Sequence, residues 1–303
     1  MKNFKGIYAA TIVPLKKDKS INKKYLKKHL KEIINIKGIK GLLINGHAGE
    51  NFTLSENEQI EVVKIAKKNK AKLSLLVSGL NYEDPLKASK IAKKMQNAGA
   101  DAIMIFPPFS WSQGVNENMI LKHHKIVCDN IKIPVFLYQS SVSTGSMAYS
   151  TSVLKKLMNI RGVIGIKEGS WNFKRYVKNY KLIRKKSKSF LIMASGDEHL
   201  YPCFKYKSDG SLVSLAAIAP KMIIEMIKLI KEKKYTKAKI LDKKLLILAK
   251  NIYGKKPANF ATARIKYCLK LLQKIPNDIM KSSIKLDKKE KMQLKNSIKN
   301  SIF

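Results

Sequence analysis

Arginine is scarce in this 303-residue sequence, where 57 of the 61 basic residues are lysine and only 4 are arginine. Acidic residues are also few, at 21, so the net charge is +40. A charge of that size favours a polyanionic partner such as nucleic acid. Arginine, however, is the preferred residue for phosphate and base contacts, and the lysines are spread over nearly every expected helix. We therefore expect solvated lysines and no specific nucleic-acid partner.

Cysteine and long apolar runs are scarce as well. The three cysteines, Cys128, Cys203 and Cys268, form no CxxC pair and show no metal-ligand spacing, which is typical of reduced thiols in a cytosolic protein. No run reaches the roughly 18 apolar residues that a membrane helix needs. Residues 1–20 contain no apolar segment of signal-peptide length. These absences predict a cytoplasmic protein with no membrane partner.

What is present is an alternation of short apolar runs with amphipathic segments. Apolar residues recur at helical spacing in segments such as 25–36 and 85–99. Strands that alternate with helices imply parallel pairing, and eight such units match a (β/α)8 TIM barrel. A doubly wound open sheet is the alternative, but no GxGxxG follows the first strand. The expected strands are 6–15, 41–46, 72–79, 102–108, 134–139, 163–169, 190–197 and 210–218.

From about residue 221 the expected strands stop and only helical patterns follow. We therefore predict an α/β fold in which residues 1–232 form the barrel and catalytic domain. Residues 233–303 are predicted to form a C-terminal helical extension.

One lysine stands apart from the solvated majority. Lys167 lies in "VIGIKEGS", at the end of a run that reads as a buried strand. Strand alternation places Val163, Gly165 and Lys167 on one face, towards the barrel mouth, and Ile164 and Ile166 on the other. Burial lowers a lysine's pKa, and a neutral amine is a nucleophile towards a ketone. An ordinary ion pair of Lys167 with an adjacent acid is the alternative interpretation.

Two further strand ends carry residues that suit such an amine. Tyr138 shares a face with Phe136 on the fifth strand, and a phenol beside an amine can move protons during imine formation. "GHAGE", from Gly46 to Glu50, follows the second strand, and its glycines permit a tight turn with free N–H groups for an anion. A packed aromatic and an ordinary loop are the simpler interpretations of each alone. Together with Lys167 they predict a Schiff-base enzyme that acts on a 2-oxo acid.

These motifs resemble the dihydrodipicolinate synthase and N-acetylneuraminate lyase superfamily of class I aldolases and dehydratases. The resemblance runs from residue 6 to about residue 275 and also includes "PPF", "SGDE" and "DGSLVSLAAIAP". It implies that Lys167 forms the imine, that Tyr138 shuttles protons, and that the amides of His47 and Ala48 hold the carboxylate. It also implies a homodimer or homotetramer, places Val213 among the substrate-binding residues, and requires no metal or other cofactor.

The sequence departs from the lysine-precursor synthases at four places. His47 and Ala48 replace two hydroxyl residues of the turn, and Phe109 replaces a second tyrosine. Gln139 stands for an asparagine, and Ser143 for the arginine that grips the second substrate's carboxylate. We therefore expect a lyase, aldolase or dehydratase, acting on pyruvate or a 2-oxo-3-deoxy sugar acid, with Gln139, Ser143 and His47 near the substrate. The alternatives are a 4-hydroxy-tetrahydrodipicolinate synthase and a non-catalytic 2-oxo-acid-binding barrel.

Several acidic residues have simpler structural interpretations. Glu50 is expected to fix its own turn by hydrogen bonds, and Glu168 is expected to point away from the barrel. The run from Asp197 to His199 resembles a metal cluster, but it lies at a helix start, where acidic residues act as caps.

Overall fold

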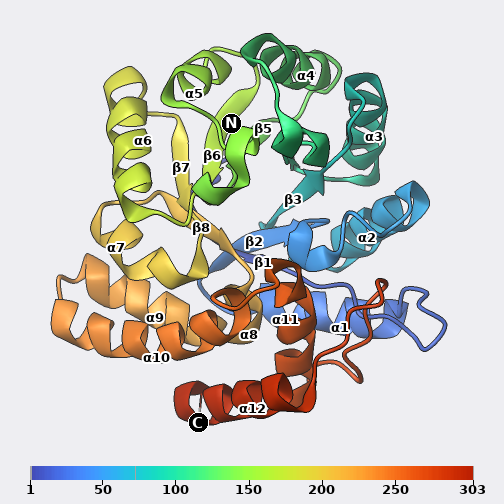
Figure 1. Ribbon diagram of the computed structural model, residues 1–303, viewed down its shortest axis with the longest axis vertical. Helices are drawn as coiled ribbons and strands as arrows, with labels where there is room; N and C mark the ends of the chain where they lie inside the picture. The colour runs from blue at the N-terminus through green and yellow to red at the C-terminus, as the bar shows by residue number, and fades with distance from the viewer. Residues whose placement is uncertain (1, 72, 303) are drawn as a thin grey trace.

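The computed structural model describes residues 2–71 and 73–302, in which eight parallel strands close into a barrel (Figure 1). Each strand pairs with its neighbours in sequence, and β8 closes the ring on β1. The strands are β1 (Gly6–Ala10), β2 (Ile39–Ile44), β3 (Leu75–Leu80), β4 (Ala102–Ile105), β5 (Val135–Gln139), β6 (Val163–Glu168), β7 (Leu191–Ala194) and β8 (Gly210–Val213). The predicted TIM barrel is confirmed.

Helices cover the outside of the barrel because each buries one apolar stripe against the strands. In the first helix Leu26, Leu30 and Ile33 are buried, and most of its lysines are exposed. Several helices begin at a side-chain cap, as Ser55 and Glu58 show with a complete capping box. The helices around the barrel are α1 (Lys23–Ile34), α2 (Glu56–Asn69), α3 (Pro85–Ala98), α4 (Glu117–Asp129), α5 (Thr151–Leu157), α6 (Phe173–Lys186), α7 (Leu200–Lys205), α8 (Leu215–Ile218) and α9 (Pro220–Lys231).

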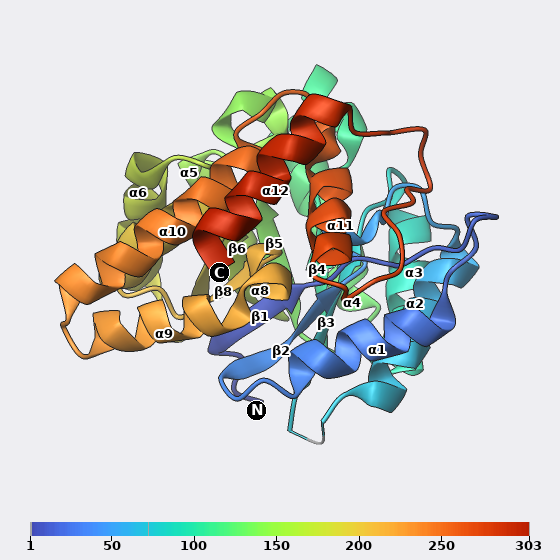
Figure 2. The ribbon, with the colours of Figure 1, turned by 90° about the horizontal axis from the view of Figure 1, so that it is seen from below.

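The C-terminal extension consists of α10 (Tyr235–Tyr253), α11 (Ala261–Leu271) and α12 (Lys288–Ile302). Helix α10 packs on α9 and α12 (Figure 2). Helix α11 packs against the turn that follows β2. The predicted division at residues 232 and 233 falls in the turn between α9 and α10. Among the described residues, no helix has both the length and the apolar character to cross a bilayer.

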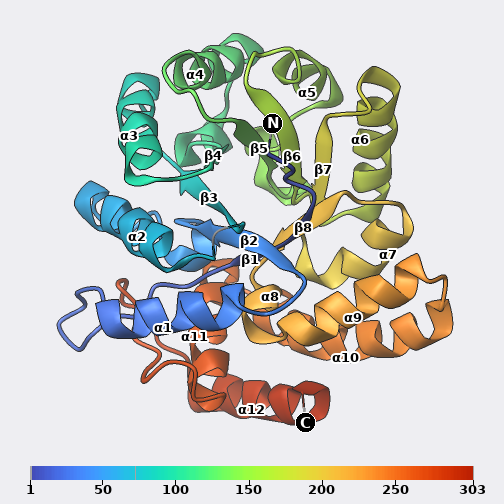
Figure 3. The same ribbon diagram turned by 180° about the vertical axis from the view of Figure 1, so that it is seen from behind.

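The strands separate two cores, as their two-residue period requires. Tyr8, Leu43, Met104 and Phe136 belong to the cluster inside the barrel, while the alternate residues pack against the helices. The N-terminal segment crosses the end of the barrel that faces the viewer in Figure 3. Phe4 of this segment is buried, and its ring meets that of Phe136 edge-on with centroids 5.7 Å apart. This end, the floor, is therefore closed, and the opposite end, the mouth, carries the loops that follow the strands.

The sixth strand corrects one detail of the predicted alternation. Val135 pairs with Val163, but the next residue of β5, Phe136, pairs with Gly165, so Ile164 forms a bulge. Consequently Val163 packs in the outer core and Ile164 packs against the inner cluster, the reverse of the prediction. Beyond the bulge the alternation resumes, and the predicted inward position of Lys167 is unaffected.

Four predicted strands are shorter than expected. Those predicted at 102–108 and 190–197 end at Ile105 and Ala194. The first strand ends at Ala10 and not at residue 15. The last ends at Val213 and not at residue 218, because Leu215–Ile218 forms the short helix α8. Apolar periodicity alone cannot separate a strand end from a short buried helix.

Candidate active site

Lys167 and Tyr138 lie side by side at the mouth of the barrel. They are register partners on β6 and β5, and the Lys167 ammonium lies 5.2 Å from the centre of the Tyr138 ring. Gly165 makes room below them, because a Cβ there would lie 2.8 Å from Leu191 and 2.9 Å from the Phe136 ring. The strand that carries the lysine therefore requires glycine two residues earlier.

The surroundings of this pair favour an uncharged amine and a protonated phenol. No acid among the described residues lies within 4.0 Å of the Lys167 ammonium. Burial lowers the pKa of Lys167 to about 8, with Asp197 opposing the shift. At pH 7 roughly one such lysine in ten is neutral, against roughly one in three thousand at the ordinary pKa. Burial raises the pKa of Tyr138 to about 12, so the phenol keeps its proton at neutral pH.

The GHAGE motif forms a short 3-10 turn, η1 (His47–Gly49), directly after β2. The residues on either side, Asn45 and Glu50, have φ values of 49° and 56°, which non-glycine residues adopt only when the surroundings enforce them. The amides of Gly49 and Glu50 donate within the turn. Those of His47 and Ala48 have no backbone partner recorded among the described residues, as is usual for the first positions of a helix. These two amides can bind a carboxylate.

The His47 side chain belongs to an aromatic wall on this side of the mouth. Its ring lies 4.4 Å from Phe106 and 5.6 Å from Tyr138, measured between centroids, and 6.1 Å from Phe109. Burial, with a contribution from Lys167, lowers the pKa of His47 to about 3. At neutral pH His47 is therefore uncharged and a poor base, but it can still donate or accept one hydrogen bond. Its Nε2 atom is buried and has no partner among the described residues.

The other predicted substrate-binding residues differ in burial and in the direction of their side chains. Gln139 is buried, follows Tyr138, and is register partner of Glu168, so strand alternation turns its side chain from the face that holds Lys167. Ser143 is exposed and its hydroxyl lies 2.8 Å from that of Ser141.

Val213 packs in the outer core, so only its main chain faces the mouth. Glu168, as predicted, points outward: its carboxylate accepts hydrogen bonds from Ser170 and Asn179, both at 3.0 Å.

A polar wall that the sequence analysis missed follows β7 and β8. Asp197 follows β7, is buried, and accepts hydrogen bonds from the Leu215 amide at 2.7 Å and the Tyr253 hydroxyl at 3.3 Å. The Tyr253 hydroxyl also lies 2.5 Å from that of Ser214. Burial raises the pKa of Asp197 to about 6, with Lys167 among the groups that oppose the shift. Asp197 makes no side-chain cap bond to the helix start where it lies, which corrects the predicted cap, and it bonds α8 and the extension instead. Its place at a strand end was the available signal.

Tyr253 could not be found in this way, because it lies on α10 of the extension and not at the end of a strand. Among the described residues, no group of three or more histidine, cysteine or acidic side chains is arranged to hold a metal ion.

Comparisons with known proteins agree on one family. The model of the dihydrodipicolinate synthetase family matches residues 3–301. A 4-hydroxy-tetrahydrodipicolinate synthase of Methanothrix thermoacetophila is 26% identical over 250 residues, which is 82% of each chain. Dihydrodipicolinate synthase of Bacillus anthracis has the same fold, with a TM-score of 0.89 at 18% identity over 99% of both chains. N-acetylneuraminate lyase of Fusobacterium nucleatum superposes with a TM-score of 0.83 at 24% identity over 98% of both chains.

Proposed function

The chain belongs to the dihydrodipicolinate synthetase family, a family of lyases, and from that premise we propose that it forms an imine between Lys167 and a 2-oxo acid. One observation carries the proposal. A half-buried lysine with a lowered pKa and no described acid in contact is the register partner of a protonated tyrosine, close to a turn with two free amides. The three elements supply the nucleophile, the proton carrier and the carboxylate site that the reaction needs.

The reaction starts with attack of the neutral Lys167 amine on the keto carbon, which gives a carbinolamine. As the carbinolamine forms, Tyr138 passes one proton from the nitrogen to the former keto oxygen. Tyr138 then donates its own proton to the carbinolamine hydroxyl, so that water leaves and a protonated imine lies beside the Tyr138 phenolate. The amides of His47 and Ala48 hold the carboxylate meanwhile, so that the keto carbon faces the amine. In an aldol cleavage the protonated imine accepts the electron pair of a nearby C–C bond as that bond breaks. In a dehydration it accepts the pair of a neighbouring C–H bond as the phenolate removes that proton, and the resulting enamine then expels a hydroxyl group as water. Either an aldolase or a dehydratase is therefore possible.

The substrate that we propose is a 2-oxo-3-deoxy sugar acid. Ser143 and its neighbours from 139 to 145 carry no cation that could pair with a second carboxylate. The polar wall of Asp197, Ser214 and Tyr253 offers a carboxylate and hydroxyls, which suit sugar hydroxyl groups. The relatives named as 4-hydroxy-tetrahydrodipicolinate synthases support the alternative, condensation of pyruvate with aspartate semialdehyde.

The two activities can be compared on a single enzyme preparation. A second carboxylate at Ser143 lacks a charge-assisted bond worth about 1.5 to 3 kcal/mol, or about ten- to a hundred-fold in specificity. We expect a higher kcat/KM for cleavage or dehydration of a 2-oxo-3-deoxy sugar acid. A higher value for condensation with aspartate semialdehyde restores the synthase assignment. The homodimer or homotetramer remains a prediction, which light scattering checks.

A further inference from the structure

Helix α11 of the C-terminal extension contacts the η1 turn. We propose that Thr262 and Lys266 of α11 are positioning residues, which hold the amides of His47 and Ala48 in the geometry that binds the substrate's carboxylate. The inference rests on the proposed function, because it concerns how that carboxylate is held. It assigns part of the active site to the extension, which contributes no strand to the barrel.

The first contact is a buried ion pair. The Lys266 ammonium bonds Oε1 of Glu50, and both side chains are only 1% exposed. The same ammonium donates to the Ile279 carbonyl at 2.7 Å. The second oxygen of Glu50 accepts from the Lys281 amide at 2.8 Å. Both carboxylate oxygens thus bond the extension and not the turn itself, which corrects the prediction that Glu50 fixes its own turn by side-chain hydrogen bonds.

The second contact holds the other end of the turn. Thr262 lies one helical turn before Lys266, so the two side chains share a face of α11. The Thr262 hydroxyl donates to the His47 carbonyl at 3.2 Å. One face of α11 therefore bonds the first residue of η1, His47, and the residue that closes it, Glu50.

These contacts suit a positioning role better than a role in stability alone. A buried ion pair is a weak way to gain stability, since apolar replacements are often neutral or better. The backbone of the η1 turn, by contrast, needs contacts from outside the turn to keep its conformation. Glu50 and Asn45 are both in the left-handed region, and such conformations persist only where the surroundings enforce them. A shift of the turn would misdirect the two free amides without touching Lys167.

A substrate pair separates the two roles. Pyruvate presents a carboxylate to the turn, whereas hydroxyacetone is a ketone of similar size without one. Both can be trapped on Lys167 with borohydride, and the concentration that gives half-maximal trapping reports binding. The ratio of the two concentrations depends on the carboxylate site, and a general loss of stability leaves it unchanged.

Thr262→Val removes the hydroxyl at nearly constant volume. We expect half-maximal trapping to need about two- to ten-fold more pyruvate, as for one lost hydrogen bond, with hydroxyacetone unaffected. Thr236→Val, at an exposed position of α10, is the control and should match wild type. Equal pyruvate requirements in Thr262→Val and Thr236→Val would remove Thr262 from the proposal.

Lys266→Met leaves the Glu50 carboxylate buried without its cation, so the melting temperature should fall. Adding Glu50→Gln removes the second charge and should restore much of that temperature. We expect the double variant still to need at least about ten-fold more pyruvate, since the link to the turn is gone. The control is Lys270→Met, on the same helix as Lys266, which removes a half-exposed ion pair between Lys270 and Asp278.

If pyruvate binding recovers together with the melting temperature in the double variant, Lys266 is structural and the proposal fails. The proposed function fails separately, when the wild-type protein itself gives no pyruvate adduct on Lys167. Wild-type trapping with unchanged ratios in every α11 variant overturns this inference alone.

Discussion

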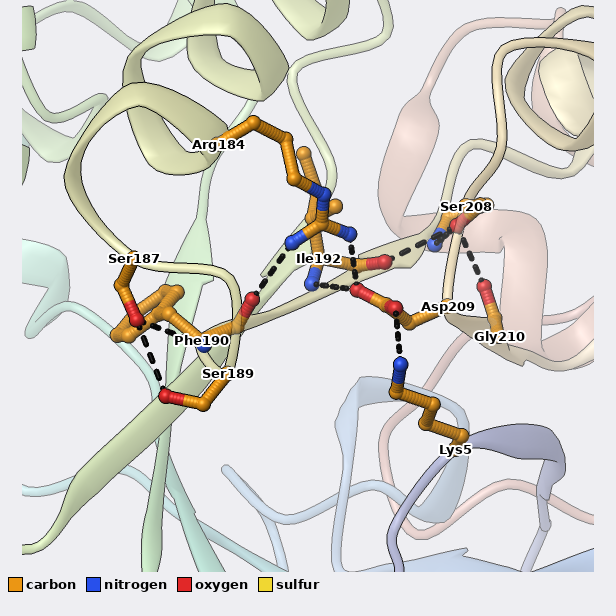
Figure 4. Close-up of polar contacts among 10 residues, drawn as sticks. Lys5, Arg184, Ser187, Ser189, Phe190, Ile192, Ser208, Asp209 and Gly210 are labelled. Carbon is orange, nitrogen blue, oxygen red and sulfur yellow. Dashed lines mark hydrogen bonds and ion pairs between the residues drawn. The ribbon is translucent and has the colours of Figure 1, made fainter.

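At the floor of the barrel the buried carboxylates lie against cations, whereas at the mouth the half-buried Lys167 has no described acid in contact. Asp209 pairs with Arg184 and with Lys5, at 3.2 Å, and accepts from the Ile192 amide at 3.0 Å (Figure 4). Asp101 pairs in the same way with Lys2 and with Lys70, at 3.0 Å. At the mouth, Asp197 accepts only neutral donors among the described residues.

The pKa values show what this difference does. Burial pushes the pKa of Asp101 upward, but the bonds from Lys2 and Lys70 outweigh it and the pKa is lowered. At the mouth burial prevails: the pKa of Lys167 falls to about 8 and that of Asp197 rises to about 6. Pairing thus keeps the buried Asp101 charged, whereas the unpaired groups at the mouth have pKa values nearer to neutral pH.

Replacing the mouth lysine should have the largest effect. Lys167→Ala is expected to abolish the borohydride-trapped pyruvate adduct, seen by mass spectrometry of the intact protein, with no loss of melting temperature, because the ammonium has no acid partner to lose. Lys70→Ala at the floor should do the opposite, trapping normally and melting lower. A stoichiometric adduct in Lys167→Ala would identify another lysine as the nucleophile.

Breaking a floor pair should cost stability and not activity. Asp101→Asn leaves Lys70 without its buried partner, and we expect the free energy of unfolding to fall by about 2 to 4 kcal/mol at pH 7. Denaturant titration measures it. Asp129→Asn, which breaks an exposed pair with Lys125, should cost less than about 0.5 kcal/mol. Equal losses in the two variants would show that the floor pairs behave as ordinary surface pairs.

The phenol at the mouth can be tested against one near the floor. Tyr138→Phe should lower turnover about a hundred-fold, the usual size of a lost acid–base group, while half-saturation by pyruvate changes little. Tyr8→Phe removes a buried hydroxyl with no described partner inside the barrel and should leave turnover unchanged. Steady-state kinetics on the two variants measures both turnover rates. Normal turnover in Tyr138→Phe would exclude the Tyr138 hydroxyl from proton transfer.

The smallest expected effect is a shift in pH dependence. Imine formation needs the neutral amine, so its rate should rise with pH and level off above about 8, the pKa of Lys167. Asp197 favours the charged amine, so Asp197→Asn should lower the lysine's pKa and move the curve to lower pH, by up to about one unit. Stopped-flow trapping with pyruvate at a series of pH values measures this rise in the rate of imine formation. A curve that moves to higher pH would show that Asp197 does not act through charge.

Much of the site followed from local pattern. Two-residue alternation and the geometry of parallel strands predicted that Tyr138 and Lys167 meet at one end of a barrel, and the paired register confirms that they do. A buried strand end with a glycine two residues earlier was sufficient to single out Lys167 among 57 lysines. The turn after the second strand was also visible, because its glycines punctuate the sequence.

The remaining features belong to the tertiary structure alone. The bulge at Ile164 depends on hydrogen-bond register with β5, which the apolar pattern of β6 does not encode. The contact between Asp197 and Tyr253 joins residues 56 positions apart, and that between Glu50 and Lys266 joins residues 216 apart. The sequence by itself thus determined the fold and the placement of Lys167 beside Tyr138, because these depend on periodicity and neighbouring strands. Only the packed chain decided which groups compensate buried charge, because that depends on contacts between segments that no local pattern links.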